Sequence, residues 1–212
     1  MANVAGDPFS GGLPETIQNQ VRQHHVVYPR LPPQGIYFEH LAERAFVLNG
    51  AVDAHIAPNA PNQPEHDLFV GQHRISLKTE TGGHTKLQTI NITKLCTTER
   101  DPWEEEALVA HALLHLSRYD HMLMLRAIWP QAEGHIHYQL VDIPVPLLRR
   151  LGNITFAPVG RRPGRHSLGG DYVAADGHVS FHVHFDGSDG KCQVRNLSVA
   201  DCRVLREWDQ RY

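Results

Sequence analysis

The strongest constraint on the fold is a segment, residues 67–80, in which an apolar run, a turn signal and a strictly alternating stretch follow one another. Side chains at every second position share one face of a β-strand. One face of the alternating stretch carries Ile75, Leu77 and Thr79, and the other carries Arg74, Ser76, Lys78 and Glu80. Gly71, a turn residue, separates this stretch from the apolar run Leu68–Val70. The sequence therefore predicts a β-hairpin that brings Asp67 close to Lys78.

Asp67 and Lys78, held together in this way, have a definite chemical use. A carboxylate supplies the oxygen ligands that hard divalent cations prefer, and an ammonium group stabilises the oxyanion that develops when water attacks. The pair therefore points to hydrolysis of a phosphodiester, as in the cleavage of nucleic acid. The alternative is that Lys78 and Glu80 face solvent on a half-buried strand and that Asp67 merely begins a strand.

Periodicity and turn residues predict the other helices and strands. Residues 36–48 place apolar side chains at helical spacing and end at Asn49-Gly50, which predicts a helix. Asp101-Pro102 is a typical helix start, and the apolar run at residues 122–128 predicts a strand covered on both faces. The remaining predictions are helices at residues 14–23, 101–117 and 198–208, and strands at residues 51–56 and 87–92.

Three consecutive glutamates at residues 104–106 allow two interpretations. Negative charge in the first turn of a helix is stabilised by the helix dipole. Three carboxylates close together could also bind a metal ion. We prefer the dipole interpretation because it requires nothing beyond the predicted helix.

Length and composition favour one folded domain. The chain has 212 residues, of which 41% are hydrophobic, enough to bury a core. No apolar stretch approaches membrane-spanning length and the first residues lack the pattern of a secretory signal, so a soluble cytoplasmic protein is expected. The three cysteines, Cys96, Cys192 and Cys202, have no paired spacing. We expect reduced thiols rather than a disulfide framework or a zinc site.

The net charge of −3 conceals an uneven distribution of charge. Residues 1–142 carry 10 Lys and Arg against 16 Asp and Glu, whereas residues 143–212 carry 10 against 7. An acidic first part suits metal-binding carboxylates, and a more basic second part suits contacts with phosphates. The 16 histidines add neutral donors and acceptors, and each can become positively charged near a polyanion.

A second hairpin is predicted over residues 178–195. Residues 178–185 alternate, a turn follows at residues 186–190, and a second strand begins at Lys191. The polar face of the first strand carries His178, Ser180, His182 and His184, and that of the second carries Gln193 and Arg195. Two-stranded ribbons fit the major groove of DNA, where arginine reads guanine and glutamine reads adenine by paired hydrogen bonds. The hairpin is therefore a candidate for DNA recognition.

Two other interpretations of this hairpin stay open. It can be an ordinary amphipathic hairpin with one face in solvent. His182 and His184 can also form the His-x-His pair of a zinc or iron site, as in cupin-like barrels, although no further ligand is evident from the sequence. Basic residues elsewhere are candidates for contacts with the DNA backbone, namely Lys86, Arg161, Arg162 and Arg165, together with Lys191.

The order of predicted elements resembles the core of the PD-(D/E)xK nucleases, and within them a small type II restriction endonuclease. The matching positions are Glu39 on the first core helix, Asp67, and Ile75–Thr79 before a glycine-containing loop. His66 stands before Asp67 in place of the proline of the motif, a proline that the family often lacks. The resemblance covers roughly residues 33–130.

This resemblance implies an α/β (α+β) fold, with a central mixed β-sheet flanked by helices and a C-terminal β-hairpin elaboration. The whole chain, residues 1–212, is then expected to form a single nuclease domain. Residues 1–32 form an arm and a short helix, residues 33–130 form the catalytic core, and residues 131–212 form the part that recognises DNA.

The resemblance also implies roles for individual residues. Asp67 binds Mg²⁺, with Glu39 contributing directly or through water, and Lys78 orients the attacking water or stabilises the oxyanion. Ser76 stands where the family usually carries a second acid, and it would hydrogen-bond a water on the metal. Either Glu39 or Glu80 then supplies the missing carboxylate, and we prefer Glu39.

The expected activity is Mg²⁺-dependent, sequence-specific hydrolysis of both strands of DNA, by a monomer or a homodimer. One alternative is a DNA-binding module of the same fold that lost catalysis when Ser76 replaced the acid. The other is a histidine-metal enzyme built on a cupin-like β-domain.

Overall fold

The computed structural model describes residues 6–57, 67–98, 102–129, 134–160 and 166–212. Contacts divide the chain into two compact units. Unit 1 comprises Met1–Thr85, Tyr119–Ile143 and Arg203–Tyr212, and unit 2 comprises Lys86–Arg118 and Pro144–Cys202. Each unit is assembled from segments that are distant in the sequence. The predicted division into a core at residues 33–130 and an elaboration at residues 131–212 stays a prediction.

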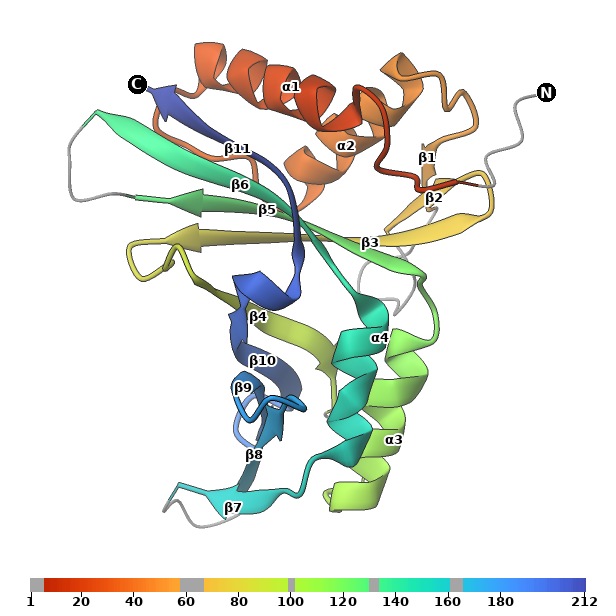
Figure 1. Ribbon diagram of the computed structural model, residues 1–212, viewed down its shortest axis with the longest axis vertical. Coiled ribbons are helices and arrows are strands. Elements are labelled where there is room, and N and C mark those ends of the chain that lie inside the picture. Colours follow the sequence, from red (N-terminus) through yellow and green to blue (C-terminus); the bar gives the residue numbers. More distant parts are fainter. Residues whose placement is uncertain (1–5, 58–66, 99–101, 130–133, 161–165) are drawn as a thin grey trace. The chain divides into compact units, whose positions relative to one another are not determined.

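Unit 1 contains a six-stranded mixed sheet (Figure 1). In spatial order its strands are β1 (His55–Ile56), β2 (Leu68–Val70), β3 (His73–Gly82), β5 (His121–Ile128), β6 (His135–Ile143) and β11 (Arg203–Arg211). β2 and β3 form the predicted hairpin, with Gly71 at a positive φ of 59° in the turn. β3 pairs in parallel with β5, whereas the other neighbouring strands are antiparallel. The hairpin is thereby joined to the buried strand that was predicted at residues 122–128.

Two helices, α1 (Leu13–Val27) and α2 (Ile36–Leu48), lie over one face of this sheet (Figure 1). The predicted helix at residues 36–48 is confirmed, and the one at residues 14–23 is confirmed and extends to Val27. The buried side of α2 carries Phe38, Ala42, Ala45 and Phe46. These side chains pack in one core cluster with apolar residues from several strands, including Leu68, Ile75, Leu77, Leu123, Leu125 and Tyr138. Burial of this apolar face fixes α2 on the sheet.

A row of polar side chains crosses four strands of the same sheet. Strand register places Glu80 of β3 beside Arg126 of β5, Arg126 beside Gln139 of β6, and Gln139 beside Glu207 of β11. Arg126 Nε donates to Glu80 Oε2 over 2.7 Å, Arg126 Nη1 donates to Gln139 Oε1, and Gln139 Nε2 donates to Glu207 Oε1. Arg126 is fully buried and Glu80 is 8% exposed. The polar face of the hairpin strand is therefore not simply a solvent-facing surface.

Unit 2 contains a five-stranded antiparallel sheet (Figure 1). In spatial order its strands are β4 (Thr89–Thr97), β10 (Lys191–Ser198), β9 (Val179–Asp186), β8 (Ser167–Val173) and β7 (Ala157–Val159). Its helical elements are α3 (Glu105–Leu116), α4 (Val145–Leu148) and the 3₁₀ helices η1 (Arg149–Asn153) and η2 (Val199–Asp201). β9 and β10 form the second predicted hairpin, which is confirmed.

Three predicted boundaries differ from the structure. The strand predicted at residues 87–92 is β4, which runs from Thr89 to Thr97 and pairs with β10 in unit 2. The strand predicted at residues 51–56 is limited to His55–Ile56. The helix predicted from Asp101 begins at Glu105, and Asp101 itself lies outside the described residues. Glu105 and Glu106 occupy the first turn of α3, as the dipole interpretation of the three glutamates requires.

The helix predicted at residues 198–208 is wrong. A short 3₁₀ turn covers Val199–Asp201, and the chain then forms strand β11, which pairs antiparallel with β6. Trp208 is 6% exposed and stacks on Tyr138 of β6, with ring centroids 5.0 Å apart. The available edge of β6 supplies backbone partners and an aromatic contact, which override a weak local preference for helix.

The predicted fold class is confirmed. The chain is a mixed α+β protein whose unit 1 has a restriction-endonuclease-like core, a mixed sheet with helices. No helix in the described part of the chain is long and apolar enough to cross a membrane.

Candidate active site

Asp67 and Lys78 lie together in unit 1, as the hairpin predicts. Lys78 Nζ is 3.4 Å from Asp67 Oδ2, and both side chains are about one-quarter exposed, at 24% each. The same oxygen accepts a hydrogen bond of 3.1 Å from Ser76 Oγ and one of 2.6 Å from the backbone N–H of Leu77. Three donors on one strand therefore converge on a single carboxylate oxygen.

The backbone around Asp67 explains this convergence. Its N–H donates to the carbonyl of Ile75 over 3.0 Å, and its own carbonyl accepts from the N–H of Ala57 over 3.1 Å. Asp67 thus extends the pairing of β2 between β1 and β3, one residue before the strand itself begins. Its carboxylate reaches across to β3, where alternate side chains Ser76 and Lys78 share a face.

Glu39 of α2 lies within electrostatic reach of this pair. Burial raises the pKa of the Glu39 carboxyl above its ordinary value, the Asp67 carboxylate raises it further, and Lys78 opposes the shift. Glu39 is only partly exposed. The helix packed on the sheet therefore adds a second carboxylate to the side of the hairpin where Asp67 and Lys78 meet.

Glu80, the other candidate for the missing acid, occupies a different environment. Its carboxylate forms the ion pair with buried Arg126 described above, in the row of polar groups across the sheet. A carboxylate whose charge is compensated by a buried guanidinium is a poor ligand for an additional cation. Of the two candidates, Glu39 has the more suitable surroundings.

Sequence reasoning missed Glu43, which lies one helical turn after Glu39 on α2. Glu43 Oε1 accepts a hydrogen bond of 2.9 Å from the backbone N–H of Ile56, and its other oxygen is 3.7 Å from His40. Ile56 is the last residue of β1 and precedes the residue that bonds to the carbonyl of Asp67. Glu43 therefore links α2 to the edge of the sheet beside the site. The spacing of four residues from Glu39 is the signal that could have identified it.

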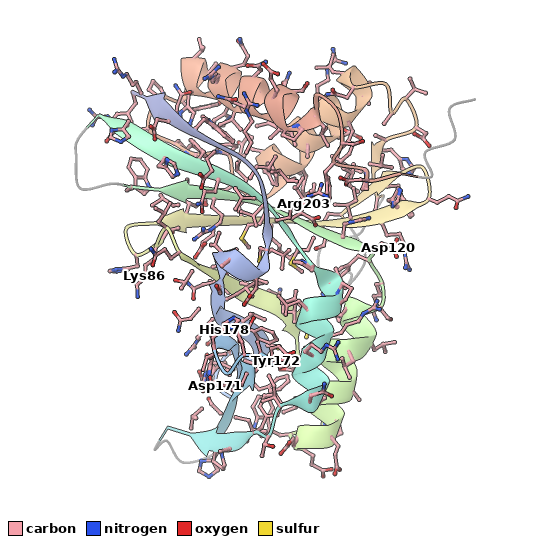
Figure 2. The ribbon with its side chains drawn as sticks, in the orientation of Figure 1. Lys86, Asp120, Asp171, Tyr172, His178 and Arg203 are labelled. Atoms are coloured by element: carbon pink, nitrogen blue, oxygen red, sulfur yellow. The ribbon has the colours of Figure 1, made fainter. Side chains whose placement is uncertain are left out.

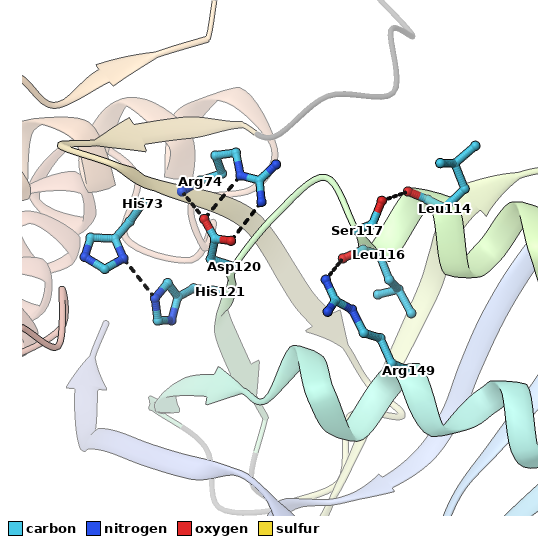
Figure 3. A network of polar contacts seen from close by, with 8 residues as sticks. All are labelled: His73, Arg74, Leu114, Leu116, Ser117, Asp120, His121 and Arg149. Carbon is cyan, nitrogen blue, oxygen red and sulfur yellow. Dashed lines mark hydrogen bonds and ion pairs between the residues drawn. The ribbon is translucent and has the colours of Figure 1, made fainter.

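A second set of polar contacts fixes the start of β3 to the start of β5 (Figure 3). Arg74 forms two side-chain hydrogen bonds with Asp120, of 3.2 Å and 2.8 Å. His121 Nε2 and His73 Nδ1 are 3.3 Å apart. Arg74 thus holds a neighbouring carboxylate and does not join Lys78 at the site, although the two share a face in the alternating pattern.

The carboxylates of unit 1 fit a divalent cation in part. Among the described residues, no group of three or more His, Cys, Asp or Glu side chains is arranged to hold a metal ion. Mg²⁺, however, retains several waters and commonly takes one or two protein carboxylates. Asp67 raises the pKa of Glu39, so the two carboxylates repel each other, and a cation between them would relieve this repulsion. Asp67 and Glu39 are therefore the two carboxylates that would hold such an ion.

Unit 2 presents a polar row on its second hairpin. Register places His184 opposite Gln193 and His182 opposite Arg195, so these four side chains share one face of β9 and β10. The other face carries Phe181, Val183, Cys192 and Val194, which are buried. Ser180, predicted on the polar face, is itself buried and donates to Asp201 Oδ2 over 2.5 Å. His178 also contacts Asp201, with Nε2 at 2.9 Å from the same oxygen.

The remaining predicted contact residues have separate locations. Lys191 is paired with Asp189 in the turn, at 2.6 Å. Lys86, the first residue of unit 2, forms an isolated antiparallel β-bridge with Thr89 through the backbone. Arg161, Arg162 and Arg165 lie outside the described residues. His182 Nδ1 contacts Asp171 Oδ1 over 2.7 Å, so one of its two ring nitrogens is already engaged.

All three cysteines are free thiols. Cys96 of β4 and Cys192 of β10 are nonetheless direct cross-strand partners, a proximity that their spacing did not reveal. A hydrogen bond with Cys96, together with burial, raises the pKa of the Cys192 thiol, so Cys192 is protonated at neutral pH.

Comparison with known proteins agrees with the geometry. A family model described as SmaI, type II site-specific deoxyribonuclease, matches residues 2–210. The chain is also 26% identical over 208 residues to the type II restriction enzyme SmaI of Serratia marcescens, a match that covers 97% of this chain and 83% of that enzyme. No solved structure matches the chain significantly.

Proposed function

The chain belongs to the SmaI family of type II site-specific deoxyribonucleases, and from this membership we propose that it hydrolyses both strands of DNA at a specific sequence with the help of Mg²⁺. The observation that carries this proposal is the convergence of Lys78, Ser76 and a backbone N–H on one oxygen of Asp67. Glu39 supplies the second carboxylate nearby.

Each residue of the site has a role that follows from its chemistry. When bound by Asp67 and Glu39, Mg²⁺ would supply a bound water of lowered pKa and neutralise charge on the scissile phosphate. Lys78 places a positive charge next to Asp67, where it stabilises the phosphate oxyanion or orients the attacking water. Leu77 N–H and Ser76 Oγ hold the carboxylate of Asp67 in one orientation by its Oδ2 atom, and a bound cation would take the other oxygen.

Ser76, which stands where the family usually has an acid, forms a hydrogen bond with Asp67. A second carboxylate at this position would repel Asp67, whereas the hydroxyl donates a hydrogen bond to it. In this proposal the second carboxylate is Glu39 of α2, which interacts electrostatically with Asp67 and Lys78. This arrangement supports an active nuclease over a DNA-binding module that has lost catalysis.

The two units divide the work in this proposal. Unit 1 carries the cleavage residues, and the polar face of β9 and β10 in unit 2 contacts DNA through His182, His184 and Arg195. Lys86, Lys191 and the arginines at residues 161, 162 and 165 are proposed to contact the DNA backbone, because phosphates attract such side chains independently of sequence. Whether one chain or a pair of chains performs the cut stays a prediction.

Cleavage of plasmid DNA tests the proposal. The purified protein is incubated with a supercoiled plasmid and Mg²⁺, with EDTA in a parallel reaction, and the products are separated by size. We expect discrete fragments that depend on Mg²⁺. The variants Lys78→Ala, Asp67→Asn and Glu39→Gln should each reduce cleavage on the order of 100-fold or more, as expected for loss of an electrostatic or metal-binding group at a reacting centre.

Two controls make the result decisive. Asp53→Asn removes an exposed carboxylate elsewhere in unit 1 and should cleave like the wild type. Circular dichroism of every variant should show that the fold persists. Intact plasmid with the wild type over a range of divalent cations, together with retained binding in a gel-shift assay, would favour the non-catalytic module instead.

A further inference from the structure

The hairpin of β9 and β10 contains one arginine whose orientation is fixed by a neutral neighbour. Arg195 donates from Nε and from Nη2 to the same oxygen, Gln193 Oε1, over 2.9 Å and 2.6 Å. Both residues lie on the polar face of β10, two positions apart. The edge of the guanidinium formed by Nε and Nη2 is thereby engaged, whereas Nη1 has no hydrogen bond to the described residues.

Gln193 is placed to hold Arg195 rather than to contact a ligand. It is 9% exposed, and the oxygen that would define a paired contact with adenine is taken by Arg195. A neutral amide also orients the guanidinium without cancelling its charge. Within the described part of the chain, Arg195 forms no ion pair with a carboxylate.

The neighbours of Arg195 are not those of a phosphate site. Its cross-strand partner His182 is held by Asp171 of β8, which is labelled in Figure 2. The diagonal neighbour His184 has a pKa lowered by burial and by Arg195 itself, so it is neutral at neutral pH. A phosphate site gathers several unpaired cations, whereas Lys191, the other cation on this face, is paired with Asp189.

The strand next to β9 also makes room for this arrangement. Gly169 of β8 lies opposite His184, and a Cβ built on Gly169 would come within 3.1 Å of Nε2 of His182. A side chain at residue 169 would therefore displace the ring of His182. Residues of three neighbouring strands, β8, β9 and β10, therefore determine the position of the side chains around Arg195.

We propose that Arg195 is a specificity-determining residue that reads the O6 and N7 acceptors of one guanine in the major groove, and that Gln193 is the positioning residue that orients it. This inference rests on the proposed function, because it assumes that the substrate is DNA. The end of the guanidinium formed by Nη1 and the second hydrogen of Nη2 offers two parallel donors, which match the two acceptors of guanine.

Selection from a random pool of DNA duplexes tests this proposal without requiring cleavage. The full-length protein is incubated with the pool in Ca²⁺ and, separately, without added metal, and the bound duplexes are sequenced. The wild type should prefer guanine at one position of its site, or at two symmetric positions. In Arg195→Ala and in Arg195→Lys, that preference should fall on the order of 10-fold to 100-fold, with the other positions unchanged.

The lysine variant separates the proposed contact from a contact with phosphate. Lysine keeps the charge but lacks the paired donors of arginine. If Arg195→Ala weakens binding to all sequences alike and Arg195→Lys restores it, Arg195 contacts the backbone and the proposal is wrong. Gln193→Met keeps the volume but not the acceptor, and it should relax the preference at the same position as Arg195→Ala. Loss of preference at a different position in Gln193→Met would contradict its role in positioning Arg195.

Controls separate this inference from folding and from the proposed function. Arg150→Ala removes an exposed arginine of η1 and should leave the base preference intact. Thermal unfolding of each variant identifies any that are destabilised. Arg195 is only partly buried, so the lysine variant is expected to fold. If the wild type selects a sequence but does not cleave it with Mg²⁺, the proposed function fails and this inference stands. If the wild type cleaves DNA and Arg195→Ala keeps the wild-type base preference, the proposed function stands and this inference fails.

Discussion

At the scale of single residues, the site in unit 1 is organised by one carboxylate oxygen. Asp67 Oδ2 receives the hydroxyl of Ser76, the N–H of Leu77 and the ammonium group of Lys78. Hydrogen bonds from three donors hold the side chain of Asp67 in one rotamer. The two candidates for the second acid of the proposed site, Glu39 of α2 and Glu80 of β3, differ sharply in their surroundings.

Substitution of each glutamate by glutamine distinguishes their roles. Glu39→Gln should abolish cleavage with little change in stability, because its charged form is already disfavoured by burial and by Asp67. Glu80→Gln should lower the free energy of unfolding by about 3 kcal/mol, because it removes a negative charge that pairs with the buried Arg126 guanidinium. Urea denaturation and plasmid cleavage measure the two effects. A stable Glu80→Gln protein that cannot cleave DNA would reverse the assignment.

Asp142 of β6 predicts a dependence of stability on pH. Burial raises its pKa from 3.8 to about 6, with Arg203 opposing the shift. A carboxyl whose pKa is higher in the folded state binds its proton more tightly there, so its contribution to stability is present below about pH 4 and is lost as the pH rises to about 6. Asp142→Asn carries no such charge. Above pH 6 it should be more stable than the wild type by up to about 3 kcal/mol, and near pH 4 the difference should vanish.

Denaturant unfolding of both proteins from pH 4 to pH 8 measures this difference. The exposed carboxylate of Asp53 provides the matched control, since Asp53→Asn should show no comparable change across the same range. A constant difference between Asp142→Asn and the wild type at every pH would contradict the prediction, because a titrating group cannot produce it.

At the scale of secondary-structure elements, close backbone approach explains one glycine of β8. A Cβ built on Gly170 would lie 2.4 Å from Cγ2 of Ile154 and 2.7 Å from the carbonyl oxygen of Thr155. No real Cβ tolerates these distances, so residues 154–155 pack against the strand only because position 170 has no side chain. The glycine marks contact between the segment that follows η1 and the sheet of unit 2.

Gly170→Ala should therefore destabilise the protein by about 1–3 kcal/mol through overpacking. The melting temperature measured by differential scanning fluorimetry reports this loss. Gly83→Ala is the matched control, since nothing lies within 4 Å of a Cβ at residue 83. An unchanged melting temperature in Gly170→Ala would mean that residues 154–155 move aside without penalty.

At the scale of the whole molecule, the sheet of unit 1 is completed by the last segment of the chain. Strand β11 forms its edge next to β6, and Trp208 stacks on Tyr138. Glu207 ends the polar row that begins at Glu80. The chain passes through all of unit 2 before this strand is added, so residues far apart in sequence have to meet before the sheet is complete.

Deletion of residues 203–212 tests this dependence. The shortened chain should lose hydrogen-exchange protection at the amides of β6, because these amides lose the strand that covers them, and Tyr138 should become accessible. A chain that lacks only Tyr212 serves as the control and should keep this protection. Unchanged exchange rates in β6 of the longer deletion would show that the strand adds little to the sheet.

The sequence by itself determined the elements that depend on local pattern. Two-residue alternation and a turn predicted both hairpins, and helical spacing predicted residues 36–48. Because pairing across a short turn follows from the chain itself, the proximity of Asp67 to Lys78 also followed, as did the shared face of Gln193 and Arg195. Membership of the nuclease family agrees with that pattern.

The tertiary structure decided everything that depends on a distant partner. β11 is a strand because β6 offers it an edge, although its local sequence resembled a helix. β4 joins the sheet of unit 2 by pairing with β10, and Glu80 forms an ion pair with Arg126. The spacing of apolar residues within one segment does not specify which other segment it pairs with. The free energy of burial and strand pairing depends on both segments.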